Sequence, residues 1–199
     1  MKRIIASMSA LIALSLPVLA AAATWNIDPD HSNISFKVKH LMVSNVKGNF
    51  DKHTGTVEIN DKDITKSKVQ VTIDTNSINT SVQKRDEHLR SADFFDVAKY
   101  PTMTFVSKEV AKAGNDKLKV TGDLTIHGIT KEVVLDVDPI SNESKDPWGS
   151  IRRGTSASTK INRKDFGLVW NKALETGGVV VGDEITINLE IEMVKAQPK

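Results

Sequence analysis

Hydrophobic and polar residues alternate along most of the chain with a period of two. Between residues 34 and 40, Ile34, Phe36, Val38 and His40 share one face of an extended chain, and the residues between them are polar. Such alternation predicts a β-strand with one buried face and one face in water. The same pattern recurs in the segments 55–59, 69–73, 118–126 and 185–193.

Strands that are wet on one face are typical of antiparallel sheets. The segment 118–137 is predicted to form one long hairpin, because a tight connection around Gly128, which can adopt a positive φ, interrupts it. Polar segments at 60–63 and 114–116 predict further turns. One strand per ~10–20 residues gives roughly eight to ten strands, so the predicted fold class is an all-β sandwich or barrel.

One segment breaks the alternation between the predicted strands 68–74 and 102–110. Residues 80–83 match a capping box, with Thr80 as N-cap and Gln83 at the third helical position, and predict a helix over about residues 81–91. A second short turn then carries Phe94 and Phe95. This helical insert near residues 81–98 has a thin apolar stripe, so we expect it to lie across an open end of the sheet or along its wall.

The first 23 residues have the three-part layout of a secretory signal peptide. A basic start is followed by an uncharged, mostly apolar stretch from residue 4 to residue 16, by Pro17 and by small residues up to Ala23. The apolar stretch is shorter than the ~20 residues that a membrane span needs. We expect cleavage after Ala23, with Ala22 as the near alternative, which leaves residues 24–199 as one domain.

Charge and cysteine content narrow the class of protein. The chain has 27 basic and 25 acidic residues, and removal of the signal peptide would take two basic residues away. The balance is then neutral and no dense basic run exists, so no nucleic-acid partner is predicted. The absence of cysteine rules out a disulfide framework. An exported chain without lipid-anchor or wall-anchor signals is expected in a bacterial periplasm.

The chain shows no signature of catalysis or metal binding. Its five histidines are scattered and none forms a ligand pair at useful spacing, so no metal is predicted. No GxSxG elbow, cysteine nucleophile or phosphate-cradling glycine loop is present. We therefore predict that the protein is not an enzyme. Carboxylates that meet in a cavity to make a hydrolase of lipids or other amphiphiles remain an alternative.

Four aromatic residues gather in residues 88–105, although aromatic residues make up only 5% of the chain. They are Phe94, Phe95, Tyr100 and Phe105. Two interpretations stay open at this point. The adjacent Phe pair either plugs an ordinary core or walls an apolar pocket with a charged mouth.

Four segments resemble the YceI-like family of bacterial proteins. They are HSNISFKVKHLMVSNVKGNF, DEHLRSADFFDVAKYPTMTF, GDLTIHGITKEV and RKDFGLVW. The resemblance implies an extended, lipocalin-like antiparallel β-barrel of about eight strands. It also implies an interior cavity for a polyisoprenoid chain, such as a polyprenyl diphosphate or the tail of an isoprenoid quinone, while some relatives resemble carriers of fatty-acid derivatives.

The function expected from this resemblance is a periplasmic binding protein that sequesters, stores or transports an isoprenoid lipid, either a polyprenyl phosphate or an isoprenoid quinone. No cofactor other than the bound lipid is expected. Transient membrane contact and a homodimer are further expectations. The alternatives are the hydrolase above and a stress-related interaction module with a filled core.

An eight-stranded barrel is about wide enough to hold one small ligand, and its inward positions alternate with outward ones. Burial of an apolar tail there is favourable by ~25 cal/mol per Å². The candidate ligand-binding residues are Phe36, Val38, His40, Phe50, Leu89, Arg90, Phe94, Phe95, Tyr100, Phe105, Leu124, Ile126, Phe166 and Trp170.

Arg90 is the first candidate for a diphosphate head group, because a guanidinium offers planar, multidentate donors. His88, His40 and Arg163 are the next candidates. The alternative is a solvated helix face with an Asp86–Arg90 ion pair at i,i+4 spacing. Adjacent helical residues point ~100° apart, so we expect only one of the two phenylalanines at 94 and 95 to face the cavity.

Overall fold

The computed structural model describes residues 22–175 and 177–197, so the predicted signal peptide lies almost wholly outside the described residues. The described strands are β1 (Ala23–Ile27), β2 (Asn33–His40), β3 (Ser44–Phe50), β4 (His53–Ile59), β5 (Lys68–Asp74), β6 (Ile78–Asn79), β7 (Thr102–Lys112), β8 (Leu118–Ile126), β9 (Ile129–Val137), β10 (Ser144–Lys145), β11 (Ile151–Asn162) and β12 (Val181–Lys195). The helical segments are α1 (Gln83–Arg90) and the 3-10 turns η1 (Ile64–Lys66), η2 (Thr75–Ser77) and η3 (Arg163–Phe166).

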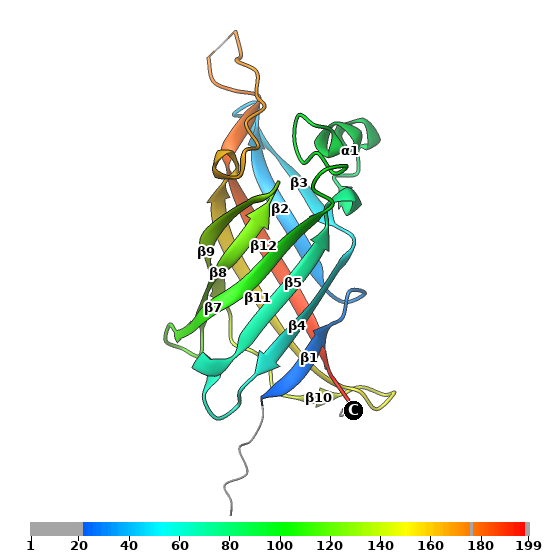
Figure 1. Ribbon diagram of the computed structural model, residues 1–199, viewed down its shortest axis with the longest axis vertical. Helices are drawn as coiled ribbons and strands as arrows, with labels where there is room; N and C mark the ends of the chain where they lie inside the picture. Colours follow the sequence, from blue (N-terminus) through cyan, green and yellow to red (C-terminus); the bar gives the residue numbers. More distant parts are fainter. Residues whose placement is uncertain (1–21, 176, 198–199) are drawn as a thin grey trace, which may run out of the picture.

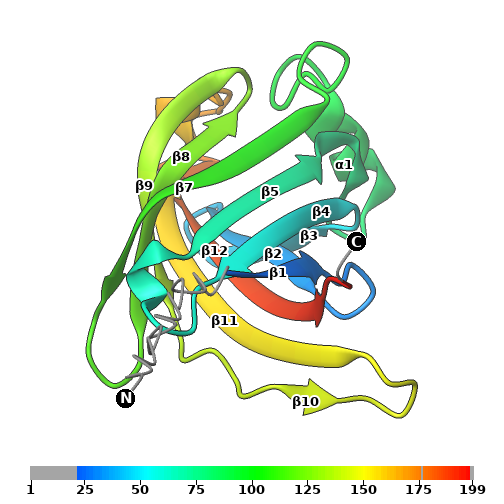
Figure 2. The same ribbon diagram turned by 60° about the horizontal axis from the view of Figure 1, so that its bottom comes forward.

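The strands form a closed antiparallel barrel. Eight of them are hydrogen-bonded in the order β11-β9-β8-β7-β5-β4-β1-β12, and pairing between β12 and β11 closes the ring. Figures 1 and 2 show the tilted strands winding around one interior. The predicted all-β, lipocalin-like barrel of about eight strands with a short helical insert is therefore confirmed.

The longest strand, β12, connects two parts of the wall. Its residues 181–190 pair with β2, and its residues 193–195 pair with β1. The β2–β3 hairpin thus continues the wall beyond β1 and β4, and β6 adds a short edge to β3. Figure 1 shows α1 beside β3 at the same end of the barrel as the tip of this hairpin. We call this end the α1 end.

The hairpin of β8 and β9 forms as the sequence predicts. Its two connecting residues, His127 and Gly128, have φ values of 51° and 73°, which are typical of the type I′ turn that matches strand twist. The inward positions of β8 are buried from Leu118 to Ile126, in strict alternation with more exposed ones. Tyr100 packs on the turn, since a Cβ at position 128 would lie 2.5 Å from its Cε1.

The predicted capping box is wrong. Helix α1 begins at Gln83, and its N-cap residue Val82 makes no side-chain hydrogen bond to the helix. Ser81 has a positive φ of 62°, which separates Thr80 from the first helical turn. The side chain of Asp86 instead accepts hydrogen bonds from both the backbone N–H and the hydroxyl of Thr80. The start of the insert is therefore held by a buried carboxylate.

Among the described residues, no helix is long and hydrophobic enough to cross a membrane.

The inner wall has a specific requirement for glycine at position 122. A Cβ there would lie 2.6 Å from the Cζ of Phe105 and 2.6 Å from the backbone oxygen of Val106. Gly122→Ala is expected to destabilise the fold by ~1–3 kcal/mol, because the Phe105 ring and the backbone must both shift. Urea denaturation should show this against Gly154→Ala, whose nearest contact is 3.4 Å away and whose effect should stay within ~0.5 kcal/mol. Equal stability of the two variants would contradict this packing.

Candidate functional site

An apolar cavity of about 250 Å³ lies inside the barrel. It extends from Ile27 and Ile59 on β1 and β4 to Phe94 and Phe95 at the α1 end, and every strand of the ring contributes to its wall. Almost all lining side chains are aliphatic or phenylalanine. Such a lining follows from the alternation in the sequence, because closure turns every apolar face toward one axis.

Nine of the predicted ligand-binding residues line this cavity: Phe36, Val38, Phe50, Leu89, Phe94, Phe95, Phe105, Leu124 and Ile126. Their contact with a ligand remains a prediction. The other five, His40, Arg90, Tyr100, Phe166 and Trp170, lie outside the lining.

The segment 83–100, which we call the lid, covers the cavity at the α1 end. Phe95 meets Phe50 edge to face with ring centroids 5.8 Å apart, and Phe50 lies 5.9 Å from Phe36 on β2. Phe94 is buried beside Trp170, with centroids 5.2 Å apart, and beside His88. The lid is therefore fastened by aromatic contacts to the barrel on two sides.

Both phenylalanines line the cavity, so the expectation that only one would face it is wrong. The reason is that they follow the helix instead of continuing it. The N–H of Phe94 donates to the carbonyl of Ser91, and the N–H of Phe95 donates to the carbonyl of Leu89. The ~100° separation of helical neighbours does not apply to this turn.

Three of the five residues outside the lining pack against other residues at the α1 end. Trp170 packs against Phe94. Tyr100 packs on His127 with centroids 4.4 Å apart. Phe166 is 1% exposed and fills the core near η3. His40 ends β2, where it is opposite Ser44 and Val181 in the sheet.

The guanidinium of Arg90 is engaged with the backbone. Its Nε and Nη2 each donate a 2.8 Å hydrogen bond, to the carbonyls of Asn76 and Ile78 respectively. Arg90 thus ties the lid to η2 and β6. The alternative prediction, an Asp86–Arg90 ion pair, is wrong. The carboxylate of Asp86 instead accepts hydrogen bonds from Thr80. A role for Arg90 in head-group binding stays a prediction that this geometry does not favour.

Arg163 is the charged residue that lines the cavity, and the sequence ranked it behind Arg90. It is 3% exposed. Its donors meet the carbonyls of Leu168, Trp170 (3.0 Å) and Gly182 (2.9 Å) and a carboxylate oxygen of Asp183 (3.2 Å). Burial lowers its pKa, and the Asp183 charge opposes that shift. Arg163 therefore fastens η3 to β12 and has its hydrogen bonds satisfied by the protein.

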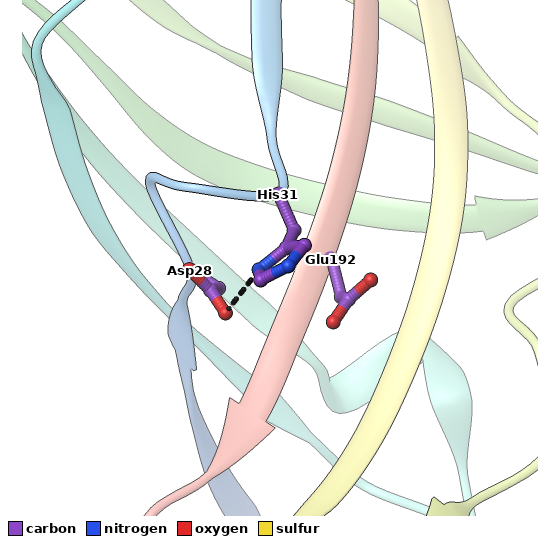
Figure 3. Close-up of side chains that lie close together, drawn as sticks. All are labelled: Asp28, His31 and Glu192. Atoms are coloured by element: carbon purple, nitrogen blue, oxygen red, sulfur yellow. Dashed lines mark hydrogen bonds and ion pairs between the residues drawn. The ribbon is translucent and has the colours of Figure 1, made fainter. Parts of the chain in front are cut away.

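Figure 3 shows a cluster of titratable groups that the sequence did not predict. Asp28, His31 and Glu192 bring potential metal-ligand atoms within 4.8 Å of one another. However, Nη1 of Arg152 lies 2.6 Å from a carboxylate oxygen of Asp28 and 2.6 Å from one of Glu192. Its Nε also donates to Asp146 at 2.7 Å. The guanidinium of Arg152 already neutralises these carboxylates, so we interpret the cluster as an ion-pair network joining β1, β11 and β12.

A closed eight-stranded antiparallel barrel with an apolar interior and a lid at one end defines the class of lipocalin-like barrels. Within that class, residues 25–193 match the YceI-like domain, and the chain belongs to this family.

Relatives agree with this assignment. A UPF0312 protein of Vibrio cholerae is 42% identical over 170 residues, which cover 84% of this chain and 89% of that protein. The crystal structure of a Campylobacter jejuni YceI protein is 39% identical, with a TM-score of 0.68 over 80% of this chain and 90% of that one. A polyisoprenoid binding domain from Saccharophagus degradans is 18% identical, with a TM-score of 0.63 over 88% of this chain and 99% of that one, and it shares the fold.

The Asp28–Arg152 contact predicts a pH dependence of stability. The hydrogen bond from Arg152 lowers the pKa of Asp28 from 3.8 to about 2 in the folded protein, although burial opposes the shift. A carboxyl with a depressed folded pKa stabilises the fold above its unfolded value, and the contribution disappears as pH falls from ~4 through ~2. Asp28→Asn should therefore lower the urea midpoint at pH 7, and its difference from wild type should shrink toward pH 2. Asp30→Asn is the matched control, and a difference that does not change with pH would contradict the ion-pair interpretation.

Proposed function

We propose that the protein is exported to the periplasm and there sequesters, stores or transports an isoprenoid lipid, whose tail lies in the barrel. The observation that carries this proposal is the shape and chemistry of the cavity. It is long, because it extends from β1 to the lid, and it is narrow, because its volume is about 250 Å³. Typical small-molecule sites measure ~300–1,000 Å³. A slender apolar chain therefore fits it better than a bulky ring system.

The lining also favours binding over catalysis. Its polar members are the residues Ser35, Ser67, Thr155 and Thr159 and the engaged Arg163. No histidine, carboxylate or lysine lines the cavity among the described residues. A hydroxyl without such a neighbour lacks the base that nucleophilic catalysis requires. The expected gain from occupancy is instead burial of apolar area, at ~25 cal/mol per Å².

The same lining bears on where the head group of the proposed lipid would lie. Burying a phosphate without a partner is unfavourable by several kcal/mol, and the described lining offers it no free cation. The head of a polyprenyl phosphate would therefore stay in contact with water at the α1 end, where the lid lies. A neutral quinone head could sit deeper. Both ligand classes remain within the proposal.

Family membership adds support. The Saccharophagus degradans neighbour is described as a polyisoprenoid binding domain, but at 18% identity it supports the fold and leaves the ligand of this chain to be identified. The lid supplies a route for exchange. Separating Phe95 from Phe50 would open the cavity at the α1 end while the barrel hydrogen bonds remain intact. Release of the lipid on contact with a membrane or partner would therefore require movement of the lid alone.

The first experiment is purification of the mature protein from the periplasm without detergent, followed by organic extraction and mass spectrometry. We expect a stoichiometric lipid with a ladder of isoprene units, whose mass would identify the head group. A fatty-acid derivative would keep the barrel function and change the ligand. An empty extract, together with no later uptake of quinone or polyprenyl phosphate, would overturn the proposal.

A second prediction concerns the lid. Phe95→Ala should accelerate release of bound lipid by at least about tenfold while lowering stability by less than the ~3–5 kcal/mol of a fully buried Phe→Ala change, since Phe95 is only partly buried. Phe166→Ala is the matched control, because Phe166 is 1% exposed and lies outside the lining. It should lose stability and keep lipid retention per folded molecule. Proportional losses of both properties in both variants would return Phe95 to an ordinary core role.

A further inference from the structure

The β2–β3 hairpin ends in three exposed apolar residues, which we call the apolar tip. Leu41, Met42 and Val43 are 39%, 51% and 78% exposed. Leu41 and Met42 have φ values of 49° and 59°, and the N–H of Val43 donates to the carbonyl of His40. These are features of a type I′ turn, whose central positions favour asparagine and glycine. Bulky aliphatic residues there carry backbone strain and leave apolar surface in water.

The surrounding chain holds the tip in this conformation. The N–H of Leu41 donates a 2.8 Å hydrogen bond to the carbonyl of Val180. A Cβ at Gly178 would lie 3.1 Å from Cγ of Met42. The segment before β12 therefore supports the hairpin from one side. Backbone strain that the surrounding structure maintains in this way is often found at functional positions.

Other exposed hydrophobic residues gather at the same end. Val82 precedes α1, and Val169 follows η3, with exposed fractions of 46% and 63%. Ile129 begins β9 and its Cδ1 would lie 3.2 Å from a Cβ at Gly167, which places it near Val169. Figure 1 shows the β2–β3 hairpin, the segment before β12 (orange) and α1 together at this end. Six of the nine large hydrophobic residues that are exposed in the described part of the chain therefore lie at the α1 end.

Lysines flank the apolar tip. Lys37 and Lys47 are directly opposite each other on β2 and β3, and Lys39 lies nearer the tip. Lys172 is also near it, because its carbonyl accepts from the N–H of Val180, whose carbonyl accepts from Leu41. All four are exposed. The carboxylates at the start of β12 are engaged elsewhere, since Asp183 pairs with Lys164 at 2.8 Å and Glu184 pairs with Lys160 at 2.9 Å. Like charges directly opposite in a sheet are destabilising, so this arrangement favours an external anionic partner.

We propose that the apolar tip and its four flanking lysines dock the protein on the surface of an anionic phospholipid bilayer. The apolar side chains would insert at the boundary of head groups and acyl chains, and the lysines would meet anionic head groups. A second copy of this chain fits less well, because the same patch would bring lysines against lysines. The proposal rests on the proposed carrier function. It deepens that function because β2 bears Phe36 and Val38 of the cavity wall and leads directly into the tip.

The test is flotation of the mature protein with phosphatidylcholine vesicles that contain or lack phosphatidylglycerol. Wild type should bind the anionic vesicles, and L41N/M42G should bind at least about tenfold more weakly, because it lacks two inserting side chains. This variant places favoured type I′ residues in the turn, so its Tm should be equal to or above that of wild type. Weaker binding at undiminished stability separates docking from folding.

Two further variants complete the test. Lys37→Gln combined with Lys47→Gln should reduce the preference for anionic vesicles and its sensitivity to salt. Val134→Thr is the control, because Val134 is a 41% exposed residue of the β9 wall away from the tip, and it should bind as wild type does. Wild-type vesicle binding by folded L41N/M42G would overturn the proposal, and equal binding to neutral vesicles would overturn its anionic part.

Lipid content measured by mass spectrometry on the same preparations separates the two proposals. An empty protein that docks on vesicles through the tip would sink the carrier function and keep the docking surface. A lipid-loaded wild type that ignores both kinds of vesicle would sink the docking surface and keep the carrier function.

Discussion

The pairing of β11 with β12 is the interaction on which the rest of the structure depends. It runs from Arg152 opposite Val194 to Asn162 opposite Glu184, and it is the contact that turns an open sheet into a ring. Once the ring is closed, each of its eight strands has a neighbouring strand on both sides, and the inward side chains point toward a common interior. The apolar cavity is a direct consequence of this closure.

Closure alone would give a filled barrel if the inward residues met across the axis. Here charged groups that could fill or divide the interior are held at its ends. Arg163 satisfies its donors on η3 and β12, and Arg152 binds Asp28, Asp146 and Glu192 at the other end of β11. The middle of the barrel is left to aliphatic and phenylalanine side chains. Because the ion pairs at the ends satisfy these charged groups, the wall between them can be apolar.

The sequence predicts β2, β4, β5, β7, β8, β9 and β12, because period-two alternation reports directly on burial in a sheet. It does not predict β1, β3 or β11, and the first half of β11 shows no such alternation of burial. It predicts the β8–β9 hairpin for a similar reason, since His127 and Gly128 carry the local signal of a tight turn. Nine lining residues follow from the same alternation and from the aromatic motifs. These are properties of neighbouring residues, so they can be read along the chain.

Other features of the site depend on contacts that local patterns do not encode. Thr80 and Gln83 match a capping box, yet the buried carboxylate of Asp86 takes the hydrogen bonds of Thr80. Arg90 looks free for a head group until the fold places the carbonyls of Asn76 and Ile78 beside it. The Asp28–Arg152 pair joins residues from distant parts of the chain. In the first two cases tertiary hydrogen bonding overrides a local signal, and in the third the sequence carries no local signal of the contact.

Two features of the molecule are unfavourable for its stability, and strand β2 connects them. A hollow of about 250 Å³, if left empty, would leave its apolar wall without packing partners, which is unfavourable for the fold. The tip of the β2–β3 hairpin adds strained, exposed aliphatic residues. Natural sequences that depart from local rules tend to do so at functional sites. An occupant that filled the hollow would remove the first penalty, and a bilayer that covered the tip would offset the second, so the two proposals would together account for both features.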